Sequence, residues 1–227
     1  DVSCTFARNP FSKEGFMAVS PVSIQFIDGE RYAIVGESGS GKTTLARMIA
    51  GLQRPTTGNI YVDGMPVYGK HKVHTNYFKE VQIIQQDSSS ALDPKMSVGR
   101  SIEEPLLCFF HLDKGERKKR CHDLMDLCNL PVEYYSRLPA ELSGGEQKRV
   151  AIARALAAEP KCLIFDEATN GFDLPLRKKI IEEIVDLQRK LAFTLIFITH
   201  DMELAVVIAD VILAVSYTHL TLPTICS

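Results

Sequence analysis

The chain has 227 residues, of which 45% are hydrophobic and 24% charged, and its formal net charge is −2 at pH 7. This length suffices for one α/β domain with an inserted subdomain, which would bury about 70% of the surface that the unfolded chain exposes. The balanced charge argues against a nucleic-acid partner, and the longest apolar segment, at residues 204–215, is interrupted by Asp210 and is too short to span a bilayer.

The first strands along the chain are expected to be antiparallel. Residues 2–6, 22–26 and 58–66 have the composition of such strands, and the last of these segments contains an Asp63-Gly64 turn. We therefore expect a small antiparallel β portion beside the main sheet.

The main sheet is predicted from continuous apolar runs without polar alternation. Runs of this kind indicate strands that are covered on both faces, as in a mainly parallel sheet. They occupy residues 32–35, 81–84, 162–165, 194–198 and 211–215. The fold class that follows is α/β, with the mainly parallel sheet as its core.

Two helical regions accompany these strands. Between residues 98 and 139 apolar positions such as Leu124, Leu127 and Leu130 are separated by charges, which predicts an inserted helical subdomain over about residues 98–158. After a break at Pro175, residues 177–191 carry their apolar side chains on one side and predict an amphipathic covering helix.

A complete phosphate-binding loop follows the apolar run at residues 32–35 and precedes a helix-like segment. Its glycines let successive backbone N–H groups converge on phosphate oxygens, and the helix adds the positive end of its dipole. Lys42 is placed to neutralise the β and γ phosphates, and the Thr43 hydroxyl to ligate Mg²⁺. The nucleotide ligands expected here are Gly36, Glu37, Ser38, Gly39, Ser40, Gly41, Lys42, Thr43 and Thr44.

Polar residues also follow three of the predicted strands, at the carboxyl edge where ligands bind in open α/β sheets. Gln86 comes after the run at 81–84, Asp166 and Glu167 after the run at 162–165, and His200 after the run at 194–198. Asp166 is suited to hold Mg²⁺, and Glu167 to polarise an attacking water molecule. These residues predict a nucleotide-hydrolysing site.

A second phosphate-binding feature lies far from the first in sequence, at Ser143, Gly144, Gly145 and Glu146. Ser143 and Glu146 fit a helix capping box. A capped helix that begins Gly-Gly also exposes free N–H groups and a dipole end to an anion. Two such features in one chain suggest that the second serves the nucleotide of another molecule.

With these motifs in this order, the chain resembles the ATP-binding subunit of an ABC transporter, over residues 1–215. Gly36–Thr44 resembles the Walker A motif, Gln86 the Q-loop glutamine, Leu142–Glu146 the signature, Asp166-Glu167 the end of Walker B and His200 the switch histidine. The resemblance implies ATP and Mg²⁺ as cofactors, with Thr43, Asp166 and Gln86 at the metal. It also implies Glu167 as catalytic base, and Phe6 or, less directly, Phe11 stacked on adenine.

The resemblance further implies partners. These are a second cassette, bound head to tail so that Ser143 closes the neighbour's nucleotide, two transmembrane permease subunits and, indirectly, an extracytoplasmic substrate-binding protein. The expected location is the cytoplasmic face of the cell membrane, and the six cysteines, which include no CxxC pair, agree with a reducing compartment. Residues 86–94 and 102–106 resemble the peptide and nickel importers of this family.

Three departures from the family pattern stand out. Glu146 replaces the more common glutamine, Asn170-Gly171-Phe172 replaces Ser-Ala-Leu before Asp173, and residues 216–227 resemble translated adapter sequence, so we expect them to be non-native. Two alternatives stay open: a soluble ABC-type ATPase of DNA repair or translation, and a nucleotide-dependent regulator outside transport. The absence of a long coiled coil or a second cassette argues against the first, and intact Lys42 and Glu167 against the second.

Overall fold

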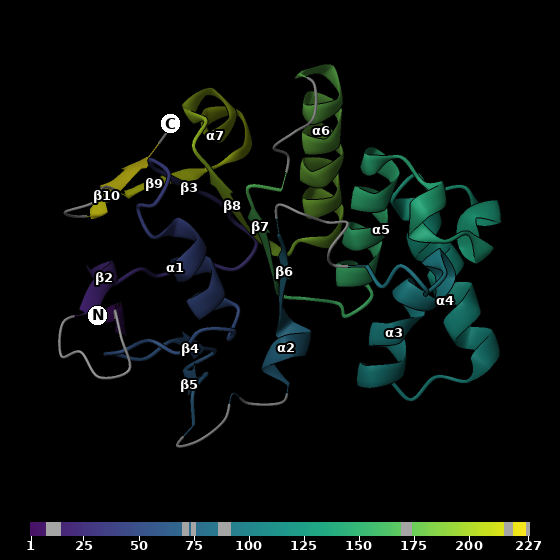
Figure 1. Ribbon diagram of the computed structural model, residues 1–227, viewed down its shortest axis with the longest axis horizontal. Helices are drawn as coiled ribbons and strands as arrows, with labels where there is room; N and C mark the ends of the chain where they lie inside the picture. Colours follow the sequence, from purple (N-terminus) through teal and green to yellow (C-terminus); the bar gives the residue numbers. More distant parts are fainter. Residues whose placement is uncertain are drawn as a thin grey trace.

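A computed structural model describes residues 1–7, 15–69, 73, 76–85, 92–168, 174–215 and 220–225 of the chain. Its main element is a six-stranded sheet with the order β10-β9-β3-β8-β7-β6 (Figure 1). Neighbours among β9, β3, β8, β7 and β6 run parallel, whereas β10 pairs antiparallel with β9. The predicted parallel core is therefore confirmed. The strands are β3 (Arg31–Val35), β6 (Val81–Ile84), β7 (Cys162–Asp166), β8 (Thr194–Thr199), β9 (Val211–Val215) and β10 (Leu220–Ile225).

Each face of the sheet carries its own apolar core, because alternate side chains of a strand point to opposite faces. In β8, Leu195 and Phe197 join a core formed with helices α5 (Gly144–Leu156) and α6 (Leu174–Leu191), while Ile196 and Ile198 join one formed with helix α1 (Lys42–Ile49). A smaller cluster joins β3 and β9 to helix α7 (Met202–Ile208). The strands are thus covered on both faces, as their continuous apolar runs predict.

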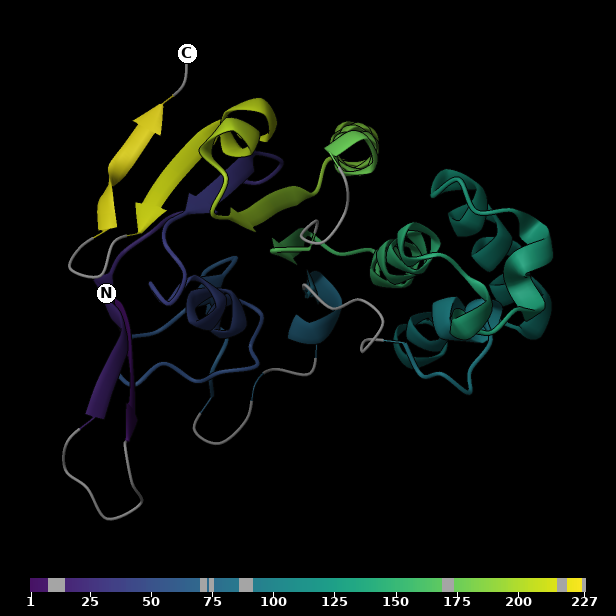
Figure 2. The same cartoon turned by 45° about the horizontal axis from the view of Figure 1, so that its top comes forward.

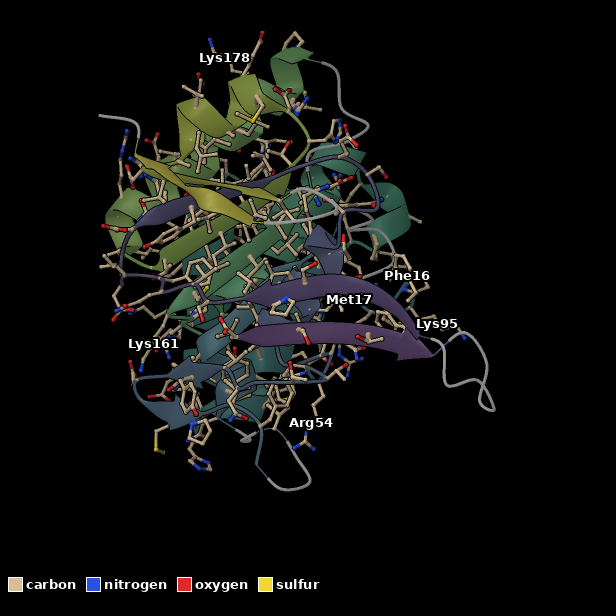
Figure 3. All side chains as sticks on the ribbon, turned by 90° about the vertical axis from the view of Figure 1, so that its left-hand side faces the viewer. Phe16, Met17, Arg54, Lys95, Lys161 and Lys178 are labelled. Carbon is tan, nitrogen blue, oxygen red and sulfur yellow. The ribbon has the colours of Figure 1, made fainter. Side chains whose placement is uncertain are left out.

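Two antiparallel hairpins lie beside the sheet. Strand β1 (Val2–Ala7) pairs with β2 (Gly15–Val22), and Figure 3 shows Phe16 and Met17 on this outer hairpin. Strand β4 (Tyr61–Val62) pairs with β5 (Met65–Pro66). The φ values of the two turn residues, 50° at Asp63 and 74° at Gly64, are both left-handed, as a tight Asp-Gly hairpin turn requires. The Asp-Gly turn is confirmed.

The strand predicted at residues 22–26 is wrong. Strand β2 already ends at Val22, and residues 23–27 belong to no strand. The backbone N–H of Ile27 donates to the Tyr32 hydroxyl over 2.7 Å, and the Phe26 ring meets the Tyr32 ring edge to face at 4.9 Å. Residues 26 and 27 therefore contact the Tyr32 side chain of β3, where pairing with a neighbouring strand was expected.

The helical region lies to one side of the sheet, beyond β6 in Figures 1 and 2. It contains α3 (Val98–Phe109), α4 (Lys114–Leu127), two 3₁₀ turns, η1 (Val132–Ser136) and η2 (Pro139–Glu141), and α5. Side-chain caps define its helix starts, since Ser97, Asp113 and Ser143 each accept a hydrogen bond from the first turn. The helices predicted between 98 and 158 are present, while their standing as a separate subdomain stays a prediction.

Helix α6 begins earlier than predicted. The helix starts at Leu174 and not at residue 177, and Pro175 lies in its first turn. Proline is tolerated there because an N–H in the first turn has no intrahelical partner. The remaining short helix is α2 (Tyr77–Glu80), before β6. Among the helices in the described ranges, none is both long and apolar enough to cross a membrane.

An ion pair ties the amino end of β3 to the start of β9. Asp210 accepts from the backbone N–H of Arg31 at 3.0 Å and from its guanidinium at 3.0 and 2.5 Å. The hydrogen bonds from Arg31 hold the pKa of Asp210 below its ordinary value of 3.8. The charged carboxylate therefore stabilises the fold at neutral pH, and this contribution is lost as pH falls through the depressed pKa.

We expect Asp210→Asn to lower the free energy of unfolding at neutral pH by about 1 kcal/mol, a figure discounted for the 43% exposure of the Asp210 side chain. Urea unfolding of both proteins between roughly pH 6 and roughly pH 3 measures the effect. The difference should shrink towards the acid end, because the wild-type carboxylate becomes protonated there. A difference that stays constant over this range would contradict the assigned role of the charge.

Candidate functional site

The residues predicted to act together meet at the carboxyl edge of the parallel sheet. Val35 at the end of β3 lies opposite Thr199 at the end of β8, and Asp166 at the end of β7 lies opposite Ile198. The loop after β3, the acids after β7 and the histidine after β8 therefore start from adjacent positions. Gln86, predicted for the same edge, lies outside the described residues.

The phosphate loop needs glycine at two positions where other segments approach closely. A Cβ at Gly41, whose φ is 93°, would collide with the carbonyl oxygen of Ala18 in β2. A Cβ at Gly36 would collide with the carbonyl oxygen of Val215, at the end of β9. The loop is thus enclosed by β2 and β9. Helix α1 begins within the loop motif, at Lys42, and the Leu45 N–H donates to the Gly41 carbonyl at 2.9 Å.

Lys42 crosses the inside of this loop. Its side chain is buried, and Nζ donates to the carbonyl oxygens of Gly36 at 2.8 Å and Glu37 at 2.7 Å. Burial lowers the pKa of the ammonium group, and the carboxylates of Glu167 and Asp166 act in the opposite direction. A polyanion bound in the loop would likewise favour the charged form, so this lysine is suited to hold phosphate.

Thr43 and Asp166 place two oxygens side by side. The Thr43 hydroxyl donates to Asp166 Oδ1 at 3.1 Å, and Asp166 is 5% exposed. Burial raises the pKa of this carboxyl, so a cation beside it would stabilise its charged form. A hydroxyl and a carboxylate are the hard oxygen ligands that Mg²⁺ takes, which means that this pair fits that ion.

Glu167 and His200 lie on adjacent strand ends. Glu167 has a φ of 49°, a left-handed value that costs energy for a side-chain-bearing residue, and its N–H donates to the Ile198 carbonyl at 3.0 Å. Its Oε1 lies 3.9 Å from Nδ1 of His200. The left-handed backbone follows the end of β7 directly, and the carboxylate lies near the histidine.

The segment after His200 is anchored from helix α6. Asp201 caps α7 through the Leu204 N–H at 3.1 Å, and its other oxygen lies 3.1 Å from the guanidinium of Arg177. The Arg177 side chain is 16% exposed. The position of His200 is therefore linked to the start of α6.

Ser143 and Glu146 form the predicted capping box. The Ser143 hydroxyl donates to Glu146 Oε2 at 2.7 Å and its backbone N–H donates to the same oxygen at 2.8 Å. These bonds hold the pKa of Glu146 below its ordinary value. The Tyr134 hydroxyl donates to the other carboxylate oxygen at 3.0 Å, so Glu146 fixes the first turn of α5 where glutamine is more common.

This second phosphate-binding feature does not join the first within one chain. In Figures 1 and 2 helices α1 and α5 lie on opposite sides of strands β6 and β7. Ser143, Gly144 and Gly145 start α5, whereas Lys42 starts α1. The structure therefore brings together Lys42, Thr43, Asp166, Glu167 and His200, and leaves the Ser143 turn apart from them.

The other site residues predicted from the sequence stand as follows. Phe6 lies in β1 opposite Phe16 and is 41% exposed, on the hairpin whose second strand touches Gly41. Phe11 and residues 169–173, with Asn170 and Asp173, lie outside the described residues. Sequence reasoning missed Tyr134, which had no motif to mark it, and Lys148, whose charge suggested a surface position.

Comparison with known proteins gives one consistent result. Residues 19–170 match the family described as "ABC transporter". The chain is 41% identical over 184 residues to the nickel import ATP-binding protein NikE of Brucella abortus, covering 81% of this chain and 69% of that protein. It is 42% identical over 187 residues to a putative peptide import ATP-binding protein of the same species, of which it spans only 56%.

Solved structures agree with the sequence relatives. The dimeric structure of MJ0796, a bacterial ABC transporter cassette, matches with a TM-score of 0.83 at 27% identity, over 99% of this chain and 96% of that one. The structure of cbiO1 from Clostridium perfringens, described as part of the ABC transporter complex cbiONQ, matches with a TM-score of 0.82 at 26% identity, over 97% of this chain and 85% of that one. Both likenesses span nearly the whole described fold.

Proposed function

The chain belongs to the ABC transporter family, and we propose that it hydrolyses ATP between two cassettes to drive the import of nickel or peptides through membrane subunits. Its relatives are ATP-binding subunits of importers, and the α/β fold with a complete phosphate loop is that of an ATPase. A soluble repair or translation ATPase is not favoured by these relatives.

One observation carries the proposal of a shared site. The phosphate loop, Asp166, Glu167 and His200 form one half at the sheet edge, and the capped turn at Ser143 lies beyond β6 and β7. Because a single chain keeps the two halves apart, a second cassette placed head to tail would supply Ser143, Gly144 and Gly145 to the nucleotide held by Lys42. The similar MJ0796 cassette is described as dimeric, which supports a site shared by two cassettes.

Within that site the residues take separate roles. Gly36, Glu37, Ser38, Gly39, Ser40, Gly41 and Thr44 surround the phosphates with Lys42, and Phe6 stacks on adenine. Glu167 accepts a proton from the attacking water, and His200, within reach of Glu167, holds the γ-phosphate. Thr43 and Asp166, with Gln86 as a further ligand, would hold Mg²⁺, and the ion would neutralise charge on the phosphate oxygens.

The partners and the solute are inferred from the relatives. The sequence relatives include a nickel import ATP-binding protein and peptide import ATP-binding proteins, so the solute is a nickel species or a peptide. We infer two membrane-spanning subunits and, on the other side of the membrane, a solute-binding protein. The chain then lies at the cytoplasmic face of the membrane. Copurification identifies these partner proteins, and the solute-binding protein among them indicates the solute.

A mixed cross-link tests the shared site. One preparation carries Ser38→Cys with one affinity tag, a second carries Ser143→Cys with another tag, and the two are combined with ATP before oxidation. We expect a covalent dimer that carries both tags, since the loop of one chain faces the capped turn of the other. The readout is a non-reducing gel probed for both tags.

Each single variant alone is the control, because native cysteines such as the exposed Cys108 could also react. The double-tagged product should exceed the background of these controls and should require nucleotide. If Ser38→Cys and Ser143→Cys reacted only when both were introduced into one chain, within that chain, the shared site would be disproved.

A further inference from the structure

A lysine is buried where helix α5 meets the end of strand β6. Lys148 is 1% exposed, the lowest value among the buried charged residues in the described part of the chain. Its Nζ donates to the backbone carbonyl of Gln85 at 3.2 Å. Gln85 directly follows β6, at the same edge of the sheet as Asp166 and Glu167.

Other polar contacts of α5 tie it to neighbouring helices. Arg149 bonds Glu183 of α6 at 2.9 and 3.1 Å, and Arg154 bonds Glu104 of α3 at 2.7 Å. The side chains in these two pairs are between 17% and 45% exposed. The contact of Lys148 differs from both, because it is buried and reaches the carboxyl edge of the sheet, where the nucleotide half-site lies.

Burying an ammonium group has a large desolvation cost. Its removal from water disfavours folding, and an apolar side chain of similar length would fill the same volume without that cost. What a methionine cannot do is donate a hydrogen bond to the Gln85 carbonyl. The presence of lysine therefore indicates that its polar contacts matter, and the bond to Gln85 is one of them.

Lys148 also lies close to the capped turn. It is five residues after Ser143 in the same helix, an axial distance of about 7.5 Å at 1.5 Å per residue. A helix transmits a displacement along its axis with little bending over so short a length. The bond to Gln85 thus connects the sheet edge of one half-site with the turn that, in the proposed function, serves the other.

We propose that Lys148 is a positioning residue for ATP hydrolysis: its bond to the Gln85 carbonyl holds the first turn of α5 in register with the carboxyl edge of the sheet. This inference rests on the proposed shared site. The residue acts through the placement of Ser143.

Lys148→Met, in the full chain with its dimer partner, tests the inference. We expect kcat for ATP to fall roughly 3- to 30-fold, the range typical of mutations that alter coupling between sites. KM for ATP and Tm should stay close to the wild-type values, because the phosphate loop is untouched and a methionine fills the space. A residue that serves packing alone would lower Tm and leave kcat of the folded protein unchanged.

Arg154→Met is the matched control, since it removes a basic side chain of the same helix that bonds Glu104 of α3. Its kcat should lie within about twofold of wild type. Ser143→Ala and the double variant with Lys148→Met complete a double-mutant cycle. Because both residues act through the same turn, the double variant should be no slower than the slower single variant.

Three results would overturn the inference: wild-type kcat in Lys148→Met, multiplicative effects in the cycle, or a loss of kcat explained by a lower Tm. If the methionine variant does not fold, Lys148→Leu is judged by the same measurements. Wild-type kcat in Ser143→Ala would contradict the proposed shared site itself. An impaired Ser143→Ala beside a fully active Lys148→Met would contradict the role of Lys148 alone.

Discussion

Replacing Glu167 with glutamine is expected to leave ATP binding intact, stall hydrolysis and trap two cassettes as a closed dimer. Glutamine has the size of glutamate but cannot accept the proton of an attacking water. The loss of a general base costs about 10²- to 10⁴-fold in rate, so kcat should fall by that factor. Phosphate release measures turnover, and size-exclusion chromatography with ATP measures the dimer.

The Glu167→Gln substitution should change the side-chain chemistry and leave the local backbone in place. The backbone at this position has a left-handed φ of 49° and is held by the bond to the Ile198 carbonyl, which a side-chain change from acid to amide leaves in place. The expected loss is therefore chemical and not conformational. Glu203→Gln is the control, because Glu203 is an exposed carboxylate in the first turn of α7, three residues after His200.

Three possible results decide the role of Glu167. Slow turnover with a nucleotide-dependent dimer supports the assignment as base. Slow turnover without any dimer would mean that the carboxylate is needed to bring the cassettes together. Turnover equal to that of wild type, with Glu203→Gln also active, would remove Glu167 from the chemistry.

Much of the sheet could be predicted because its signal is local. Strands β6 and β9 begin and end where the apolar runs do, and β3, β7 and β8 differ by one residue at one end. The wrong predictions have causes that cannot be read from the local sequence. The Tyr32 hydroxyl accepts from the Ile27 N–H. Pro175, which was expected to form a break before the helix, lies in its first turn.

The site divides in the same way. Parallel strands bring their carboxyl ends together, so the chain order of strands and polar residues was enough to join Asp166, Glu167 and His200. The carbonyls of Ala18 and Val215 against the phosphate loop are contacts of long sequence separation and have no motif. Lys148 was hidden for another reason, since a lysine in a helix is normally a surface residue.

Replacing Lys42 with alanine is expected to weaken the binding of ATP itself. In the proposed site the buried ammonium would donate charged hydrogen bonds to the bound phosphates, and each such bond contributes about 1.5–3 kcal/mol. Loss of one or more of them should raise Kd for ATP by roughly 10- to 150-fold or more. Calorimetric or fluorescence titration with ATP measures this effect without any need for hydrolysis.

Lys42→Met is the variant that separates charge from shape. Nζ of Lys42 bonds the carbonyls of Gly36 and Glu37, so alanine removes a side chain that supports the loop as well as a positive charge. Methionine keeps the length and loses only the ammonium group. Equal losses of affinity in the two variants would assign the effect to charge on the phosphates. If Lys42→Met bound ATP as tightly as wild type while Lys42→Ala did not, the lysine would serve to support the loop, and phosphate recognition would fall to the backbone N–H groups and the helix dipole of α1.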